Sequence, residues 1–496
     1  MRDRIVHAIA SAGALAEPPA VDAIETSPDP GASLDAVLRR LADTDDAPVT
    51  LTGEWVRAVL GGAPGGAARA PARAPARAPG PSPRAPSRRP AADVDGEVKV
   101  VKDPTGESLC EGKLDDFTQY FRDRLVRLRR LLRQRRESSG AQEVARLRAR
   151  AGGVRAIGMV GEVHRTANGR VHFELEDETG SVHCIAGKKA AAPADLVNDE
   201  VVLVVGSMAA GSDPALFADE IVRPDVLPGR TPARAGADVC AAFISDVHIG
   251  SKTFLEQRWE RFLEWLSDKG GHSDEVARRV KYLVVSGDLV DGVGVFPDQE
   301  RALSVSDLAE QYEILAGYLK RLPDHIEVIL LPGNHDGVRP AEPQPALPER
   351  TRRAFDSNVR FLGNPSDFDL HGVRVTAYHG RSFDDLVTNI HGMSYRRPLD
   401  MMEALLAKRH LAPIYGDKTP LAPERRDWLV MDDVPDIFVT GHVHLTGARA
   451  YKSVTLIHDS AWQDQTDYQR MMNLVPDPAR VPVVDLESGV VKVVEF

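Results

Sequence analysis

The sequence predicts an α/β domain at the C-terminal end of the chain, preceded by an all-β barrel and a small N-terminal helical module. Three observations predict this order. Buried strands alternate with amphipathic helices in residues 238–496, short alternating strands fill residues 151–230, and apolar residues recur at helical spacing in residues 1–60. A chain of 496 residues has room for about two to four such domains.

The composition is that of a soluble globular protein. Lys and Arg total 62 against 73 for Asp and Glu, the formal net charge is −11, and 43% of the residues are hydrophobic. There is no G-x-y period, no sustained heptad and no apolar run near the roughly 18 residues that a spanning helix needs, which excludes collagen-like, coiled-coil and membrane classes. The three cysteines lie far apart and fit neither a disulfide framework nor a CxxC zinc site. We therefore expect a cytoplasmic protein without a membrane partner.

Residues 1–60 contain two short helical patterns, at Ile5–Leu15 and at Leu34–Leu41, the second with Ser33 as its N-cap. They predict a small helical module. Residues 61–92 use only Ala, Gly, Pro, Arg and Ser, with eight prolines and six arginines, so no packed core is possible there. This composition predicts a disordered linker, and a solubilising tether is favoured over a nucleic-acid arm.

Residues 110–150 predict a basic helix. Apolar residues recur every three or four positions from Phe117 to Leu132, and eight arginines crowd residues 122–136. Two interpretations stay open. The arginines contact nucleic-acid phosphates and gain affinity from counterion release, or they lie on a solvated face of the helix.

Residues 151–230 predict a small barrel of the OB type. Alternating stretches (VRAIGMVGEVHRT, GRVHFELEDETG, SVHCIAG and EVVLVVGSM) are separated by Gly-containing turns, and about five strands of this length suit such a barrel. OB barrels often hold single-stranded nucleic acid, but Phe173 is the one aromatic residue that we expect on these strands. A docking module is therefore favoured.

Five predicted strands in residues 238–496 each end in polar side chains. The strands are CAAFIS, YLVVSG, IEVILLPG, VRVTAYHG and DIFVTGH. The residues at their ends are Asp246 and His248, then Asp288 and Asp291, then Asn334, His335 and Asp336, then His379, and finally His442 and His444. The carboxyl ends of strands in an α/β sheet meet at one crevice, and alternate residues of an extended segment point to the same side. The sequence therefore predicts that these side chains share one metal site.

This set of motifs resembles the calcineurin-like metallophosphoesterase superfamily, whose pattern is D-x-H, G-D-x-x-D, G-N-H-D/E, H and G-H-x-H. The resemblance covers residues 238–496 and implies two metals in a four-layer αββα sandwich. The implied ligands are Asp246, His248 and His444 for one metal and Asn334, His379 and His442 for the other, with Asp288 as the bridge. It also implies that His335 lies beside the substrate and that Asp336 orients its imidazole.

The residue types fit this chemistry. Two adjacent divalent ions can activate water and neutralise charge on phosphoryl oxygens. Imidazole, carboxylate and amide ligands without thiolate indicate Mn, Fe, Zn or Ni. His335 is suited to protonate the leaving oxygen as a general acid, and Asp291 is placed to fix the geometry of the Asp288 loop.

The stretches between the motifs resemble the small subunit of the archaeal family-D DNA polymerase, over about residues 110–496. They are GDLVDGVGVFPDQE, SFDDL, PLAPERRDWLVMDDVPDIFVTGHVH and SAWQDQTDYQRMMN. Such a subunit is a 3′→5′ exonuclease, usually manganese-dependent, that proofreads for a separate large polymerase subunit. The resemblance thus implies two Mn ions, a large catalytic subunit and a single-stranded DNA 3′ end. Arg381, Asp384 and Asp385 are candidates either for the strand-binding rim or for surface salt bridges.

Two other functions stay open. One is a scaffold subunit with little hydrolysis, similar to the B-subunits of eukaryotic replicative polymerases, in which the metal ligands are lost. The other is a stand-alone phosphodiesterase for small molecules or RNA, which the long region before the catalytic domain disfavours. The intact ligand set favours the exonuclease. A sliding clamp is a further candidate partner, although no clear clamp-binding motif is visible.

Overall fold

A computed structural model of the chain describes residues 5, 8–9, 15–16, 18–42, 50–51, 53–61, 91–148, 153–167, 169–191, 195–209, 215–267 and 274–496. The chain divides into two compact units, residues 1–90 with 488–492 and residues 91–487 with 493–496. The predicted linker at 61–92 lies outside the described residues except at its two ends. Among the described residues, no helix combines the length and the apolar character that crossing a membrane requires.

The N-terminal unit is helical. It contains α2 (Pro18–Glu25), α3 (Pro30–Ala42) and α4 (Gly53–Gly61), with a short parallel pair of strands, β1 (Leu15–Ala16) and β2 (Thr50–Leu51). Its core includes the fully buried Ile24, Val37 and Val56. The carboxylate of Asp29 accepts hydrogen bonds from the first amides of α3, so the helix begins earlier than the predicted cap at Ser33.

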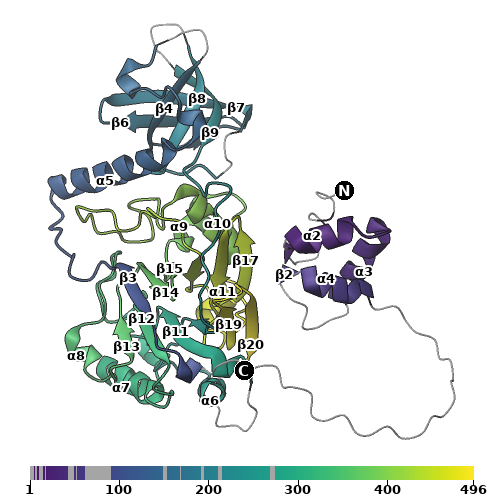
Figure 1. Cartoon of the computed structure of the whole chain (residues 1–496). Helices are drawn as coiled ribbons and strands as arrows, with labels where there is room; N and C mark the ends of the chain where they lie inside the picture. Colours follow the sequence, from purple (N-terminus) through teal and green to yellow (C-terminus); the bar gives the residue numbers. More distant parts are fainter. Residues whose placement is uncertain are drawn as a thin grey trace, which may run out of the picture. The chain divides into compact units, whose positions relative to one another are not determined.

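Two six-stranded sheets form the large C-terminal part of the chain (Figure 1). The first has the order β13-β12-β11-β10-β19-β20 and the second β17-β18-β16-β15-β14-β3. The strands of the first are β10 (Cys240–Ile244), β11 (Val280–Ser286), β12 (Glu327–Leu331), β13 (Val359–Phe361), β19 (Arg480–Asp485) and β20 (Val491–Glu495). Those of the second are β3 (Val98–Lys102), β14 (Ser366–Leu370), β15 (Val373–Tyr378), β16 (Ile437–Thr440), β17 (Gly447–Tyr451) and β18 (Val454–His458).

The strands that carry the motifs are parallel neighbours. β10 pairs with β11 and β11 with β12, while β15 pairs with β16. The five motif strands predicted from the sequence correspond to β10, β11, β12, β15 and β16. Because they run in parallel, their carboxyl ends emerge at the same edge of each sheet, which is the geometry that a shared metal site needs.

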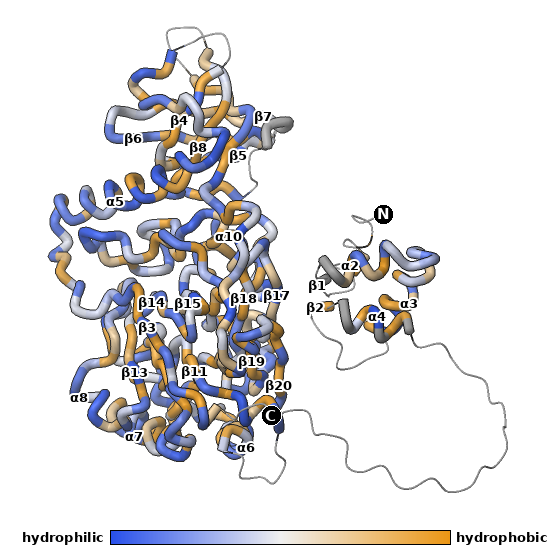
Figure 2. Tube along the Cα trace, viewed as in Figure 1, coloured by the Kyte–Doolittle hydropathy of each residue, from blue (hydrophilic) through white to orange (hydrophobic). Residues whose placement is uncertain are grey.

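Helices cover each sheet. Trp259 and Phe262 of α6 (Glu256–Leu266) and Leu315 of α7 (Leu308–Leu319) pack on the first sheet. The second sheet packs against α9 (Phe383–Asn389) and α10 (Pro398–Lys408). Two short helices, α8 (Glu349–Arg352) and α11 (Asp467–Met471), lie in connections. Hydrophobic residues concentrate along the strands (Figure 2), and every residue of β10 and β11 is buried, as expected for parallel strands covered on both faces.

A closed five-stranded barrel precedes the α/β part. Its strands are β4 (Val154–Val160), β6 (Val171–Asp177), β7 (Gly180–Ala191), β8 (Val201–Met208) and β9 (Ala215–Val222), and a sixth, short strand, β5 (His164–Arg165), lies at its edge. The order β4-β8-β9-β7-β6 closes through a β4–β6 pairing, and the short β5 pairs with β6. The strand β9 is not predicted from the sequence, and it carries Phe217, a second strand aromatic that is 45% exposed. The expectation that Phe173 is the one aromatic on these strands is therefore wrong.

The basic helix α5 (Leu114–Leu132) joins the barrel to the α/β part (Figure 1). Leu125, Leu128 and Leu132 share one buried cluster with barrel residues and with Val430. Arg124 is fully buried; its Nε donates to Asp427 Oδ2 at 2.7 Å, and its Nη1 donates to the backbone carbonyl of Asp199 beside β8 at 3.1 Å. A buried guanidinium needs such partners, because an unpaired buried charge is costly.

Several other arginines of this region also serve the fold. Arg127 pairs with Asp432, Arg129 with Glu178 of the barrel, and Arg135 donates to the carbonyl of Pro224. These side chains are engaged within the protein, so neither sequence-based interpretation of the arginines fits them. The exposed members of the cluster are Arg122, Arg130, Arg133 and Arg136.

Replacing Asp427 with Ala should destabilise the protein strongly. The variant leaves the buried Arg124 and His410 without their shared carboxylate, which costs on the order of 3–5 kcal/mol. Thermal and urea unfolding of the full chain should show it. Glu260→Ala, which removes the partly exposed ion pair with Arg321, is the control and should cost no more than about 1 kcal/mol. Similar losses in both variants would contradict this account of the buried pair.

Stability should fall as the pH drops through the range where free histidine titrates. Burial, with Arg124 nearby, lowers the pKa of His410 to about 4, whereas an unfolded histidine titrates near about 6.5. Between these values the unfolded chain binds a proton that the folded chain does not, so acid favours unfolding. The melting temperature should be lower at about pH 5 than at about pH 7. The difference should be smaller in His410→Asn. An equal drop in both proteins would exclude His410 as a contributor.

Candidate metal centre

Five of the motif residues have a backbone conformation that residues other than glycine rarely adopt. Positive φ angles occur at Asp246 (50°), His248 (52°), Asp288 (50°), His442 (82°) and His444 (59°). The left-handed region costs non-glycine residues free energy and persists only where the surroundings enforce it. Here it turns each side chain away from its strand toward a common point. Within the part of the chain that the structure describes, the side chains fall into three clusters of possible metal ligands, each with its ligand atoms within 4.8 Å of one another.

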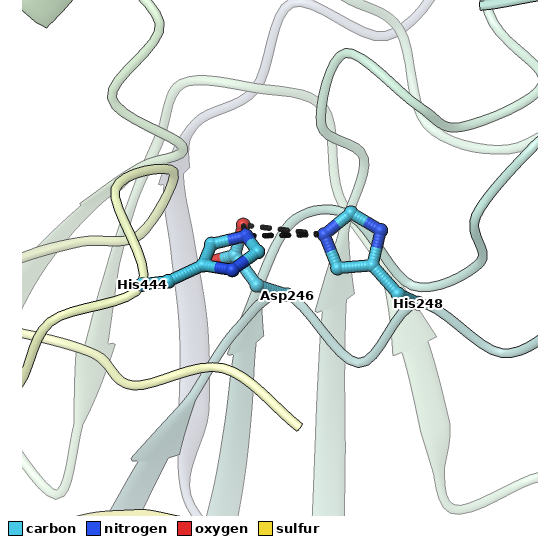
Figure 3. Close-up of side chains that lie close together, drawn as sticks. All are labelled: Asp246, His248 and His444. Carbon is cyan, nitrogen blue, oxygen red and sulfur yellow. Dashed lines mark hydrogen bonds and ion pairs between the residues drawn. The ribbon is translucent and has the colours of Figure 1, made fainter. Parts of the chain in front are cut away.

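The first cluster contains Asp246, His248 and His444, which point toward one another (Figure 3). His444 Nε2 lies 3.4 Å from Asp246 Oδ1 and 3.3 Å from His248 Nε2. All three side chains are buried. These distances bring one oxygen and two nitrogens around a single point.

Asp246 provides a direct test of whether these residues fit a cation. Its Oδ2 accepts hydrogen bonds from the Ser245 hydroxyl and from the backbone amide of His442 at 2.9 Å. Its Oδ1, although buried, accepts no hydrogen bond from any residue that the structure describes. A buried carboxylate oxygen without a donor is costly, and a metal ion satisfies it. The residues of this cluster therefore fit a divalent cation.

The second cluster contains Asp288, His379 and His442. His379 Nε2 lies 3.3 Å from Asp288 Oδ2 and 3.1 Å from the amide oxygen of Asn334. The third cluster joins Asp288 to His248 and His335. Asp288 thus belongs to two clusters and lies 3.8 Å from His248 of the first. Its carboxylate therefore lies close to imidazoles of different clusters, His248 and His379.

The charges of these groups are strongly coupled. Burial raises the pKa of the Asp246 and Asp288 carboxyls, but the adjacent imidazoles, His444 and His379 foremost, bring both below the usual range. Burial lowers the pKa of His379, yet the Asp288 carboxylate outweighs it and raises the value to about 10. The carboxylates therefore draw positive charge into the site, which a proton or a metal ion can supply.

A second layer of contacts orients the ligands. Asp291 Oδ1 lies 3.0 Å from His248 Nδ1, and the carbonyl of Ser286 lies 3.0 Å from His379 Nδ1. Each contact directs the other ring nitrogen toward the centre. The side-chain amide of Gln469 on α11 lies 2.9 Å from His444 Nδ1. Asp291 was expected in this layer; Gln469 and Ser286 were missed, because no ligand-type motif marks them.

The structure differs from the expectation in the group that orients the His335 imidazole. His335 Nδ1 donates to the backbone carbonyl of Asp291 at 2.7 Å, so Asp291 orients the imidazole in place of Asp336. The Asp336 carboxylate instead accepts from the amides of Gly333 and Leu289 and from the Tyr312 hydroxyl. Burial, together with the charge of Asp288, raises its pKa to about 7. Asp336 therefore ties together the loops that follow β11 and β12.

The three candidate rim residues divide into different roles. Asp384 Oδ2 lies 3.5 Å from His442 Nε2, and its Oδ1 accepts from the Tyr395 hydroxyl. Arg381 is half-buried and donates to the carbonyl of Pro340. Asp385 is buried and accepts from the backbone amides of Lys418 and Thr419, so it belongs to the scaffold and not to a rim.

Comparison with known proteins identifies the class to which this fold and this site belong. Residues 241–446, from β10 to just beyond His444, match the family described as the B-subunits of DNA polymerases alpha and epsilon. The DNA polymerase II small subunit of Archaeoglobus fulgidus is 45% identical over 389 residues, 78% of each chain. That of Methanocaldococcus jannaschii is 39% identical over 407 residues, 80% of this chain and 68% of the relative.

A third relative spans nearly the whole chain. The DNA polymerase II small subunit of Halobacterium salinarum is 39% identical over 517 aligned positions, which cover 99% of this chain and 98% of the relative. The chain belongs to the family of archaeal DNA polymerase II small subunits. The family resemblance seen in the sequence is thereby confirmed.

Gly441→Ala should weaken metal binding without unfolding the protein. A Cβ at Gly441 would overlap the Ser245 hydroxyl and lie 2.6 Å from Asp246 Oδ2, so it would displace the carboxylate of the first cluster. Mn²⁺ affinity, measured by titration of the metal-free chain, should fall about tenfold or more. Gly317→Ala, where a Cβ meets nothing within 4 Å, is the matched control and should bind like the wild type. Unchanged affinity in Gly441→Ala would remove Asp246 from the ligand set.

Proposed function

We propose that this chain is the 3′→5′ exonuclease subunit of an archaeal DNA polymerase II, a two-metal phosphodiesterase that acts on single-stranded DNA 3′ ends. The observation that carries the proposal is the buried Asp246 Oδ1, which accepts no hydrogen bond among the described residues. The cluster of Asp246, His248 and His444 provides for one ion, and the cluster of Asp288, His379 and His442 provides for a second. Manganese suits these oxygen and nitrogen donors, as do iron, zinc and nickel.

Each part of the chain has a role in such a subunit. Residues 238–496 are the phosphoesterase domain, in which two sheets and their covering helices make a four-layer αββα sandwich. Residues 151–230 are an OB-fold domain, residues 110–150 the basic helix that joins the two, and residues 1–60 a separate helical module reached through the 61–92 linker. The partner is the large polymerase subunit, as the name of the relatives implies.

The side chains of this site support hydrolysis of a phosphodiester. Bound metals would activate the attacking water and neutralise charge on the phosphoryl oxygens. Because Nδ1 of His335 donates to the carbonyl of Asp291, Nε2 is left to hold the proton that the leaving 3′ oxygen needs. The bond that breaks is the one between phosphorus and that 3′ oxygen, and a nucleoside 5′-monophosphate departs. A backbone phosphate carries no base identity, so no sequence preference is required.

Partner binding has separate support. Around α11 the chain exposes Tyr468 (62%), Met471 (78%) and Val475 (70%). Exposed apolar side chains gathered in one segment are typical of contact surfaces. A scaffold role is therefore the second candidate, and it is compatible with hydrolysis.

The test is hydrolysis of a 5′-labelled single-stranded DNA by the full chain with Mn²⁺. A ladder that shortens from the 3′ end is expected. His335→Ala should slow it at least about 100-fold, since general acids contribute that much, and should keep its metal. Asp288→Ala should lose both activity and metal, measured by elemental analysis.

Equal metal loss in the two variants would contradict the division between acid and ligand. No ladder with the wild type calls for the same assay with the large subunit added. Activity only in that mixture would mean that the exonuclease requires the assembled polymerase. Inactivity in the mixture would leave the scaffold role as the remaining candidate function. Hydrolysis of cyclic nucleotides but not of DNA would favour a stand-alone phosphodiesterase.

A further inference from the structure

The loop at residues 292–298 exposes apolar side chains next to His335. Val293 is 49% exposed, Val295 37% and Phe296 45%. The Phe296 ring lies 6.3 Å from the His335 imidazole, centroid to centroid, with its plane inclined by 61°. Single exposed apolar residues are common on protein surfaces. Three exposed apolar residues within four positions, beside a buried polar centre, are typical of a binding surface.

Hydrogen bonds hold this loop in place. The amide of Gly292 donates to Gln311 Oε1 at 2.9 Å, and the amide of Val295 donates to Gln299 Oε1 at 2.8 Å. Gln299 Nε2 in turn donates to the carbonyl of Asp291 at 2.8 Å. The same carbonyl accepts from His335 Nδ1. One backbone oxygen thus positions both the imidazole and the loop that carries Phe296.

Gly292 makes this close approach possible. Its φ is +74°, and a Cβ there would overlap the backbone oxygen of His335. A side chain at this position would push the loop away from the imidazole. The scaffold therefore holds the backbone of this loop close to His335.

We propose that Phe296 stacks on the base of the 3′-terminal nucleotide and positions its phosphate at the metal centre. This inference rests on the proposed function. Every base has a π-face, so an aromatic ring can receive any 3′ end without reading sequence. The ring packs against the imidazole, so a protein seated on the ring would also cover His335, which has to stay open to a phosphate. Since a base must leave its partner to reach the ring, unpaired ends are the favoured substrate.

The first test measures stacking without turnover. A single-stranded DNA with 2-aminopurine as its 3′ base and a phosphorothioate in its last linkage is added to saturating full-length protein with Mn²⁺. The wild type and Phe296→Trp should quench the fluorescence several-fold, and Phe296→Ala should not. Phe217→Ala removes an equally exposed ring on the barrel and should quench like the wild type. Equal quenching by wild type and Phe296→Ala would overturn the proposal.

The second test measures cleavage. Phe296→Ala should raise KM for single-stranded DNA about tenfold, as expected for one lost base stack, and should leave KM unchanged for a strand with an abasic 3′ end. Its metal content should equal that of the wild type. If the wild type quenches the 2-aminopurine fluorescence but cleaves no DNA, the proposed exonuclease activity is wrong and the proposed stacking is still supported. If Phe296→Ala quenches normally but binds the large subunit more weakly, the loop is a protein contact and the proposal is wrong.

Discussion

Burying a carboxylate costs free energy unless donors or cations surround it, and Asp288 is buried where two ligand clusters meet. Its Oδ1 accepts the amide of His335 and its Oδ2 faces His379. Asp246 is also buried, and its Oδ1 accepts no hydrogen bond from the described residues. The site is therefore organised around two buried carboxylates. The imidazoles of His444, His248 and His379 lie close to them.

The backbone bears part of the cost of this arrangement. Five of the ligand-type residues have left-handed φ angles, and each such conformation costs on the order of 1–3 kcal/mol. Only a rigid scaffold can enforce them. The buried parallel strands β10, β11, β15 and β16 provide it, with helices packed on the sheets and Asp336 joining the loops after β11 and β12.

Charge serves a different purpose in the region between the barrel and the α/β part. Arg124, Asp427 and His410 form a fully buried cluster in which one carboxylate oxygen accepts from both side chains. On α10, the buried Lys408 pairs with Asp195 and Glu200 beside the barrel. Buried pairs of this kind add little net stability over apolar packing, but a mismatched docking would leave charges unpaired. They therefore favour one placement of the barrel on the α/β part.

The sequence by itself determined the order of the parts, the five strands and the residue types of the site. These are local signals: hydrophobic periodicity and ligand-type residues at strand ends depend only on near neighbours in the chain. The tertiary structure alone decided which partner each group has. Asp291, and not Asp336, holds His335; Asp385 is buried; Arg124 serves the fold; and Phe296 lies beside the imidazole. Such partners come from loops and strands far apart in sequence, and their contacts depend on how the sheets and loops pack together.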